Sequence, residues 1–219
     1  MTTRVLLIRH GATVLSAEDR FAGSTDVELS DEGRSQARAL GERLAGAELA
    51  AVYASPMRRT IETAKLVIGE HTLSPQTDAG LREIDHGRWE QLTRKEVEQR
   101  FSQEYENWEA DPFTFAPEGG ESGLSVMARA LPVLRRIVVD NVGKTVAVVS
   151  HKATIRLVLC SLLGIDARGY RDRLDQSPAC LNVLDFRDPV RARLVVYNDT
   201  SHYTVRPAKS ESRLSKWWG

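Results

Sequence analysis

Two short apolar runs, each ending in a histidine, constrain most strongly what this chain can fold into. Residues 5–8 lead directly to an arginine and His10, and residues 146–149 lead to a serine and His151. An unbroken apolar run of this length is typical of a strand that is covered on both faces of its sheet. Because charged and polar side chains resist burial, each strand should end where these residues emerge at an edge of the sheet.

Segments with helical spacing alternate with the predicted strands. Ser30, which two acidic residues follow, predicts a helix start. Pro56 fits the first position of the next helix, and Pro132 predicts a kink or an early stop in a later one. The predicted strands cover residues 5–8, 50–54, 146–149, 181–186 and 194–197. The predicted helices cover residues 30–44, 55–68, 95–109, 127–138 and 155–163. The helix over 95–109 is polar, so we expect it to be exposed.

This alternation predicts an α/β fold with three layers (αβα), in which a mainly parallel central sheet carries helices on both faces. We expect one domain over residues 1–206, with a segment at about 84–123 that caps the pocket and a polar tail at 207–219. In such sheets, ligands bind beyond the carboxyl ends of the strands. The two histidines should therefore meet at one edge of the sheet, although they are far apart in the sequence.

The charge balance argues against partners that bind through bulk electrostatics. The 219 residues include 30 lysines and arginines and 30 aspartates and glutamates, so the net charge is zero. We therefore expect no nucleic-acid and no membrane-surface partner, although a local basic pocket is compatible with this balance. No apolar stretch approaches the roughly 18 residues of a membrane span, and the first predicted strand follows the initial methionine without a signal peptide.

The cysteines and histidines indicate neither a disulfide framework nor a metal site. Cys160 and Cys180 lack metal-ligand spacing, and Cys160 falls in an apolar helical run, where a buried free thiol is expected. The five histidines match no metal-binding motif. We therefore expect a cytoplasmic protein that needs no metal and no other cofactor.

Two groups of charged residues suit a phosphate site, and each also has a plain structural interpretation. Arg9 and His10 combine a planar cation that matches phosphate oxygens with a nucleophilic imidazole, but the pair could also cap a strand end. Arg58 and Arg59 stand near a helix N-terminus, which attracts anions, but an arginine pair there could also be solvated.

Glu83 and His151 are open to the same two interpretations. Glu83 could be a surface carboxylate, or a loop acid that protonates a leaving oxygen. His151 alone would be interpreted as a structural histidine. The expected position of both histidines at one sheet edge favours function for the set.

Together these segments resemble the histidine phosphatase superfamily, which includes the cofactor-dependent phosphoglycerate mutases and many metabolite phosphatases. The resemblance is carried by RHG at residues 9–11, SPMRR at 55–59 followed by Thr63-Ala64, LREIDHG at 81–87, and Ser150-His151. Residues 21–37 also look like the family's segment after the first motif, and the match spans about residues 4–203. The resemblance implies a phosphoglycerate mutase-like fold.

The resemblance also implies a role for each of five residues. His10 would be the nucleophile that takes the phosphoryl group, and His151 would lie beside the transferred phosphate. Arg9 and Arg59 would hold the phosphate oxygens, Arg59 being the member of its pair at the family's spacing from Ser-Pro. Glu83 would act as an acid in the first step and activate water in the second. Phosphoryl transfer depends mainly on positioning and charge neutralisation, which fits this set.

Departures from the mutases favour hydrolysis. The sequence differs from the mutases at Ala12, at Ser16, and at the pairs Ala22-Gly23 and Lys152-Ala153. The segment 88–122 is also shorter than in the mutases. A mutase must grip both anionic ends of a bisphosphate and exclude water, and several groups for this are missing. We therefore expect a hydrolase of small phosphate monoesters, with phosphoglycerate mutase activity as the alternative. A non-catalytic phosphate-binding module is a second alternative, against which the five intact residues count.

The remaining predictions concern the substrate. The predicted substrate-binding residues are Gly11, Ser16, Ala22, Gly23, Arg58, Glu121, Ser122 and Lys152. The partner is expected to be a phosphorylated small molecule whose identity the sequence leaves open. The oligomeric state is also open, with a homodimer among the options.

Overall fold

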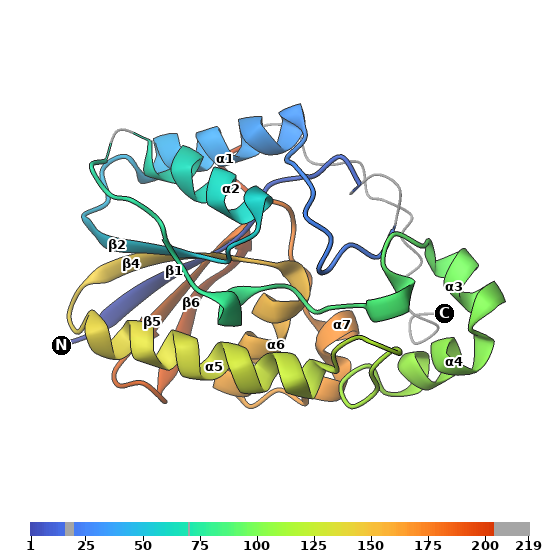
Figure 1. Ribbon diagram of the computed structural model, residues 1–219. Helices are drawn as coiled ribbons and strands as arrows, with labels where there is room; N and C mark the ends of the chain where they lie inside the picture. The colour runs from blue at the N-terminus through green and yellow to red at the C-terminus, as the bar shows by residue number, and fades with distance from the viewer. Residues whose placement is uncertain (16–19, 70, 204–219) are drawn as a thin grey trace.

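A central sheet organises the protein (Figure 1). The structure is a computed structural model, and it describes residues 1–15, 20–69 and 71–203. Within these residues the sheet has six strands in the order β3-β2-β4-β1-β5-β6. The strands are β1 (Thr3–Arg9), β2 (Leu49–Ala54), β3 (Gln76–Thr77), β4 (Thr145–Ser150), β5 (Leu181–Phe186) and β6 (Ala192–Asp199). The pairs β1–β4, β2–β4 and β2–β3 are parallel, whereas β5 runs antiparallel to β1 and to β6. The prediction of a mainly parallel sheet is confirmed.

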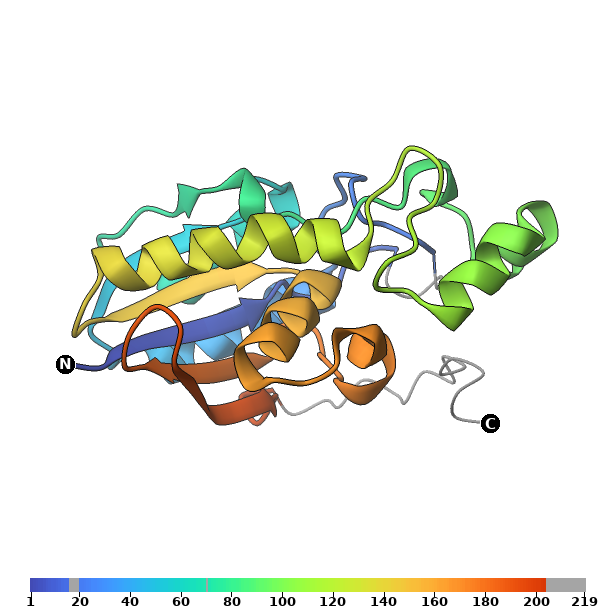
Figure 2. The same ribbon diagram turned by 90° about the horizontal axis from the view of Figure 1, so that it is seen from below.

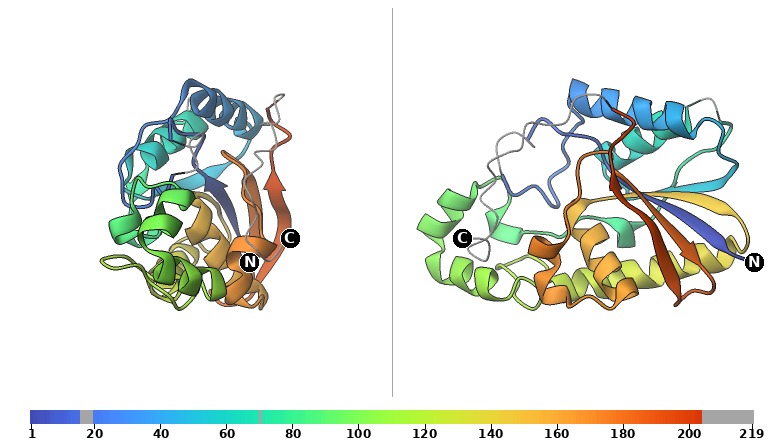
Figure 3. Two further views of the ribbon diagram at one scale, coloured as in Figure 1. Left: turned by 90° about the vertical axis from the view of Figure 1, so that its right-hand side faces the viewer. Right: turned by 180° about the vertical axis from the view of Figure 1, so that it is seen from behind.

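Helices cover both faces of this sheet, which completes the three predicted layers (Figures 1 and 3). The helices are α1 (Asp31–Leu44), α2 (Arg58–Ile68), α3 (Arg94–Arg100), α4 (Ser102–Ala110), α5 (Gly123–Asp140), α6 (Lys152–Leu163) and α7 (Tyr170–Arg173). Short 3-10 turns occupy Ala79–Leu81, Gly87–Trp89 and Ala167–Gly169. Helices α1 and α2 pack on one face, and α5 and α6 pack on the other.

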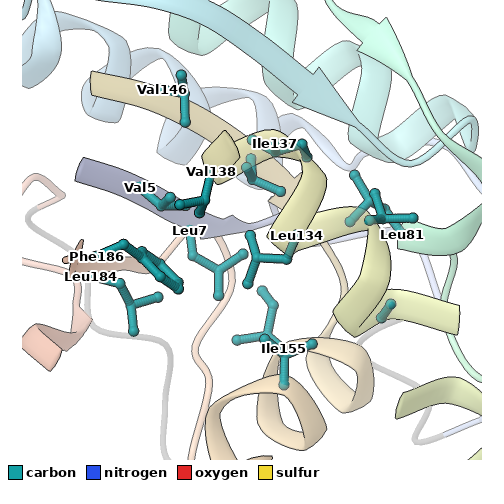
Figure 4. Close-up of a cluster of buried hydrophobic side chains, with 14 of the residues drawn as sticks. Val5, Leu7, Leu81, Leu134, Ile137, Val138, Val146, Ile155, Leu184 and Phe186 are labelled. Atoms are coloured by element: carbon teal, nitrogen blue, oxygen red, sulfur yellow. The ribbon is translucent and has the colours of Figure 1, made fainter. Parts of the chain in front are cut away.

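Alternating side chains of β1 explain why its sequence is apolar without a break. Val5 and Leu7 belong to the hydrophobic cluster under α5 and α6 (Figure 4), whereas Leu6 and Ile8 belong to the cluster under α1 and α2. Burying each such side chain stabilises the fold by about 1.5–3 kcal/mol. Because both faces of the strand are covered there, polar residues are excluded between Val5 and Ile8, and Arg9 stands where the strand reaches the edge of the sheet.

Helix α2 begins later than predicted. Ser55 continues the path of β2, because its N–H donates to the carbonyl of Val149 at 3.1 Å. Met57 has extended backbone angles and is the N-cap, so Arg58 rather than Pro56 is the first helical residue. This places Arg59 in the first turn, where its side chain is buried.

Two other helix predictions also need correction. Helix α5 does not stop at Pro132, whose own position is exposed while Ala130 and Leu134 bury the opposite face. The single exposed helix predicted over 95–109 is two helices, broken at Phe101. Its polar pattern conceals the burial of Trp108, which packs with other aromatic rings; sequence periodicity could not show this.

Helices α3 and α4 lie beyond the carboxyl ends of β1 and β4 (Figures 1 and 2). Their inner side forms an aromatic cluster with Phe21, whose ring centroid lies 5.7 Å from that of Trp108. The predicted capping segment thus stands over the end of the sheet where the site was expected. None of the helices in the described part of the chain is long and apolar enough to cross a membrane.

A close contact between two backbones fixes the loop after β1. A Cβ on Gly33, in the first turn of α1, would lie 2.0 Å from the carbonyl oxygen of Ala12, and a Cβ on Gly11 would lie 2.4 Å from the carbonyl oxygen of Gly33. Either methyl group would force helix and loop apart, and the loop directly follows His10.

We expect Gly33→Ala to lower the free energy of unfolding by about 1–3 kcal/mol, the usual cost of overpacking. Gly46→Ala is the matched control, because a Cβ at Gly46 meets nothing within 4 Å. Its effect should stay within about 0.5 kcal/mol. Urea denaturation of the two variants checks this, and an unchanged stability of Gly33→Ala would refute the close contact.

Candidate active site

The register of β1 against β4 brings the two histidines together. Arg9 lies opposite Ser150, and the N–H of His10 donates to the carbonyl of Ser150 at 3.1 Å. The ring centroids of His10 and His151 are 5.2 Å apart, and both side chains are buried. The expectation that both histidines lie at one edge of the sheet is therefore met by the geometry.

His10 presents a free ring nitrogen. Its Nδ1 lies 2.7 Å from the carbonyl oxygen of Gly11, a group that only accepts, so Nδ1 carries the proton and donates it. Nε2 then holds a lone pair. Burial, followed by the charges of Arg9 and Arg59, holds the pKa of His10 well below its ordinary value of 6.5. The imidazole is thus neutral at physiological pH, as a nucleophile must be.

His151 is held between two polar partners. Arg59 Nε lies 3.3 Å from Nδ1 of His151, and Nε2 of His151 lies 2.8 Å from the hydroxyl oxygen of Ser55. Because the guanidinium only donates, Nδ1 is the acceptor and Nε2 carries the proton. Burial, followed by the charge of Arg59, also keeps the pKa of His151 well below 6.5.

The two adjacent arginines at the start of α2 point to different places. Arg59 is 1% exposed, and its terminal nitrogens donate to the carbonyls of Thr25 and Gly23, each at 2.8 Å. The side chain of Arg58 is 68% exposed and pairs with Glu28 at 3.2 Å. Of the two, only Arg59 lines the cavity described below.

Glu90 holds the loop that positions Arg59, a role that no sequence motif indicated. Its carboxylate accepts from the N–H groups of Gly23 at 2.9 Å and of Ser24 and Thr25 at 3.1 Å each. The carbonyls of this loop are the acceptors that orient the guanidinium. Gly23, predicted to touch the substrate, instead holds the arginine.

Arg9 keeps an unused donor. Its Nη1 donates to the carbonyl of Gln176 at 2.6 Å, but its Nε is buried and has no partner among the described residues. A buried guanidinium donor without an acceptor is costly, and an anion in the adjacent cavity would supply one.

Glu83 is fixed at the start of α6. Its Oε1 accepts from the N–H and the hydroxyl of Thr154, each at 3.1 Å, and its Oε2 accepts from the N–H of Ala153 at 3.1 Å. A carboxylate at a helix N-terminus meets free N–H groups and the positive end of the dipole. These hydrogen bonds hold the Glu83 carboxylate in one orientation in the lining of the cavity.

These residues surround a cavity of about 240 Å³. Its cationic lining residues are Arg9, Arg20, Arg59, Arg94, Lys152, Arg156 and Arg171. Among the described lining residues, Glu83 is the one carboxylate. Although the whole chain has no net charge, this cavity is strongly basic and suits an anionic ligand.

The predicted substrate-binding residues divide into two groups. Ala22 and Lys152 line the cavity, whereas Gly11, Gly23, Arg58, Glu121 and Ser122 do not. Glu121 instead forms an ion pair with Arg129 at 2.8 Å, and Ser122 caps helix α5. Ser16 and the tail after 207 lie outside the described residues.

Several lining residues were not predicted. Arg156 follows Lys152 by one helical turn, a spacing that could have revealed it, because both stand just after His151. Trp108 lies on α4 and Tyr170 lies on α7, and no sequence motif indicated that either would line the cavity. Across the described residues, no group of three or more histidine, cysteine or carboxylate side chains could hold a metal ion.

Comparison with known proteins agrees with this geometry. The family model of the histidine phosphatase superfamily (branch 1) matches residues 5–200. The chain is 32% identical to phosphoserine phosphatase 1 of Hydrogenobacter thermophilus over 163 residues, which cover 74% of this chain and 77% of that protein. It is 33% identical to glucosyl-3-phosphoglycerate phosphatase of Mycolicibacterium vanbaalenii over 170 residues, covering 74% and 75%. The solved structure of Bacillus stearothermophilus YhfR superposes with a TM-score of 0.86 at 31% identity, covering 91% of this chain and 98% of that one.

The chain belongs to the histidine phosphatase superfamily. The predicted phosphoglycerate mutase-like fold is confirmed, and so is the predicted class, a hydrolase of phosphate monoesters.

Proposed function

We propose that the protein hydrolyses a small phosphorylated metabolite in two steps through a phosphohistidine at His10. One observation carries this proposal: the free Nε2 of a buried, neutral His10 stands at a cavity in whose described lining the arginines and lysine far outnumber the carboxylates. Relatives named for phosphoserine and for glucosyl-3-phosphoglycerate support a substrate of this kind. Cys160 and Cys180 are free and buried, which supports a cytoplasmic location.

In the first step, Nε2 of His10 attacks phosphorus, the N–P bond forms and the ester P–O bond breaks. Arg9 offers its unused Nε to a phosphate oxygen, and Arg59 adds positive charge from its buried position. His151 lies beside His10, within reach of the same phosphoryl group. The two arginines neutralise the charge that phosphoryl transfer redistributes, which is the main requirement of the reaction.

Among the described residues that line the cavity, Glu83 is the one with a carboxyl group. We therefore assign the proton transfers to Glu83. It passes a proton, brought by the monoanion of the substrate, to the departing alkoxide. In the second step it takes a proton from the water that attacks phosphorus and passes it to an oxygen of the departing phosphate, which restores the carboxylate. The N–P bond then breaks, inorganic phosphate leaves, and His10 returns to its neutral form.

Hydrolysis is favoured over the mutase alternative by the access of water to the cavity and by two alanines in its lining. The cavity is open enough to admit water, and Ala22 and Ala153 line it where the mutases have polar residues. The segment over 84–123 places Trp108 against the cavity, which supports its assignment as a cap that selects among substrates.

The adjacent arginines provide a matched test. Arg59→Ala should lower kcat/KM for p-nitrophenyl phosphate on the order of 100- to 1,000-fold, because a buried positive charge beside the transferred phosphate is lost. Arg58→Ala removes the same charge one residue away and should stay close to the wild type. Both assays are run in excess chelator, with phosphoglycerate mutase activity measured alongside.

Arg59→Lys keeps the positive charge and is the control for a folding defect in the alanine variant. Equal effects of the changes at Arg58 and Arg59 would refute the assignment. Loss of wild-type activity on chelation, with recovery on adding a divalent ion, would refute the metal-independent mechanism. Isomerisation of phosphoglycerate faster than its hydrolysis would favour the mutase.

Glu83→Gln should separate substrates by their leaving groups. The amide cannot transfer a proton, so phosphoenzyme formation from glycerol 3-phosphate should fall much more than formation from p-nitrophenyl phosphate, whose leaving group needs little protonation. Rapid-mixing measurements of the first turnover isolate this step from the later attack by water. The ratio between the two substrates is its own control for structural damage, and an equal loss with both would remove Glu83 from the acid role.

A further inference from the structure

Lys152 and Arg156 form a pair of cations that the phosphoryl site does not account for. They stand four residues apart on α6, so about 6 Å separates them along the helix axis. Both line the cavity. Like charges at this spacing destabilise a helix, and burial adds a desolvation cost. A pair placed in this way needs an anion to offset its charge.

The pair lacks a full set of partners within the described part of the chain. Arg156 is 8% exposed, yet its Nε is buried without an acceptor. Its Nη2 lies 3.3 Å from a carboxylate oxygen of Asp175, a residue whose side chain is 71% exposed. The side chain of Lys152 is half-buried and makes no hydrogen bond or ion pair with another described residue.

The surroundings of Lys152 reflect this excess of positive charge. Burial, then the charges of Arg156 and Arg9, lower the pKa of Lys152 to about 7. A bound anion would oppose these effects and favour the ammonium form. The location next to His151 places such an anion close to the transferred phosphoryl group, but separate from it.

Other cations of the cavity are already engaged. Arg171 pairs with Glu109 at 3.1 Å and with Asp172 at 3.3 Å, and it stacks on the ring of Trp108. Arg20 pairs with Glu96 at 3.3 Å. Apart from Arg9 at the phosphoryl site, the unused donors of the described cavity cations therefore belong to the α6 pair.

We propose that Lys152 and Arg156 form a second anion subsite, which selects phosphate monoesters that carry a carboxylate a few bonds from the phosphoryl group. This inference rests on the proposed function, since the phosphoryl end must occupy the site at His10. A carboxylate fits better than a second phosphate, because Asp175 already offsets one of the two positive charges. The remaining single charge matches a monovalent group.

Calorimetry with non-hydrolysable phosphonates tests the subsite without any turnover. The probes are 2-carboxyethylphosphonate and propylphosphonate, which differ only by the carboxylate in place of a methyl group. The wild type should bind the carboxylate probe on the order of 10- to 100-fold more tightly. Lys152→Gln and Arg156→Gln should each reduce this ratio, whereas Arg135→Gln, on the exposed face of α5, should leave it unchanged.

A wild-type ratio near one would overturn the proposal, and this comparison needs no substitution that could fail to fold. Equal weakening of both probes by the α6 variants would also overturn it, because the pair would then serve the phosphoryl group. Tighter binding of ethane-1,2-diylbisphosphonate than of 2-carboxyethylphosphonate would contradict the choice of a carboxylate.

A comparison of phosphate esters with and without a carboxylate distinguishes a failure of the subsite proposal from a failure of the proposed phosphatase activity. The wild type should hydrolyse 3-phosphoglycerate with a kcat/KM on the order of 10- to 100-fold above that for glycerol 3-phosphate. If no phosphate monoester is hydrolysed, the proposed function fails, while the phosphonate ratio still decides the subsite.

Discussion

The parallel pairing of β1 with β4 is the interaction on which the site depends. It aligns Arg9 with Ser150, and the N–H of His10 donates to the Ser150 carbonyl at 3.1 Å. The two histidine rings consequently lie 5.2 Å apart. Both strands are buried on both faces, and a slip of register by one residue would exchange the side chains of the two faces. The hydrophobic core thus fixes the distance between two polar groups that do not belong to it.

Burial of cations beside neutral imidazoles sets the chemistry of this edge. Burial, followed by the charges of Arg9 and Arg59, lowers the pKa of His10 and leaves its Nε2 unprotonated. The positive charge of the two arginines is available to an anion. The loop carbonyls that orient Arg59 are held in turn by Glu90. The site is therefore assembled before a ligand arrives, which is what electrostatic stabilisation of phosphoryl transfer requires.

Sequence patterns predicted the features that depend on single strands and short motifs. They failed for features that depend on tertiary packing between distant segments. The sheet edge followed from the apolar runs, and the choice of Arg59 over Arg58 followed from the resemblance to the family's spacing after Ser-Pro. The break at Phe101 and the burial of Trp108 depend on aromatic rings from distant segments, so local polarity was misleading. Glu121 was predicted to bind substrate, but it pairs with Arg129, whose position also depends on the carbonyls of Gly80 and Glu83 from a distant segment.

The most direct test of the account is to identify the residue that carries the phosphoryl group during turnover. Rapid acid-free quenching of the enzyme with p-nitrophenyl phosphate, followed by peptide mass spectrometry, should find an acid-labile phosphohistidine at His10, and His10→Ala should neither form the adduct nor turn over. A stable phosphoryl adduct on another residue, or normal turnover by His10→Ala, would contradict the account.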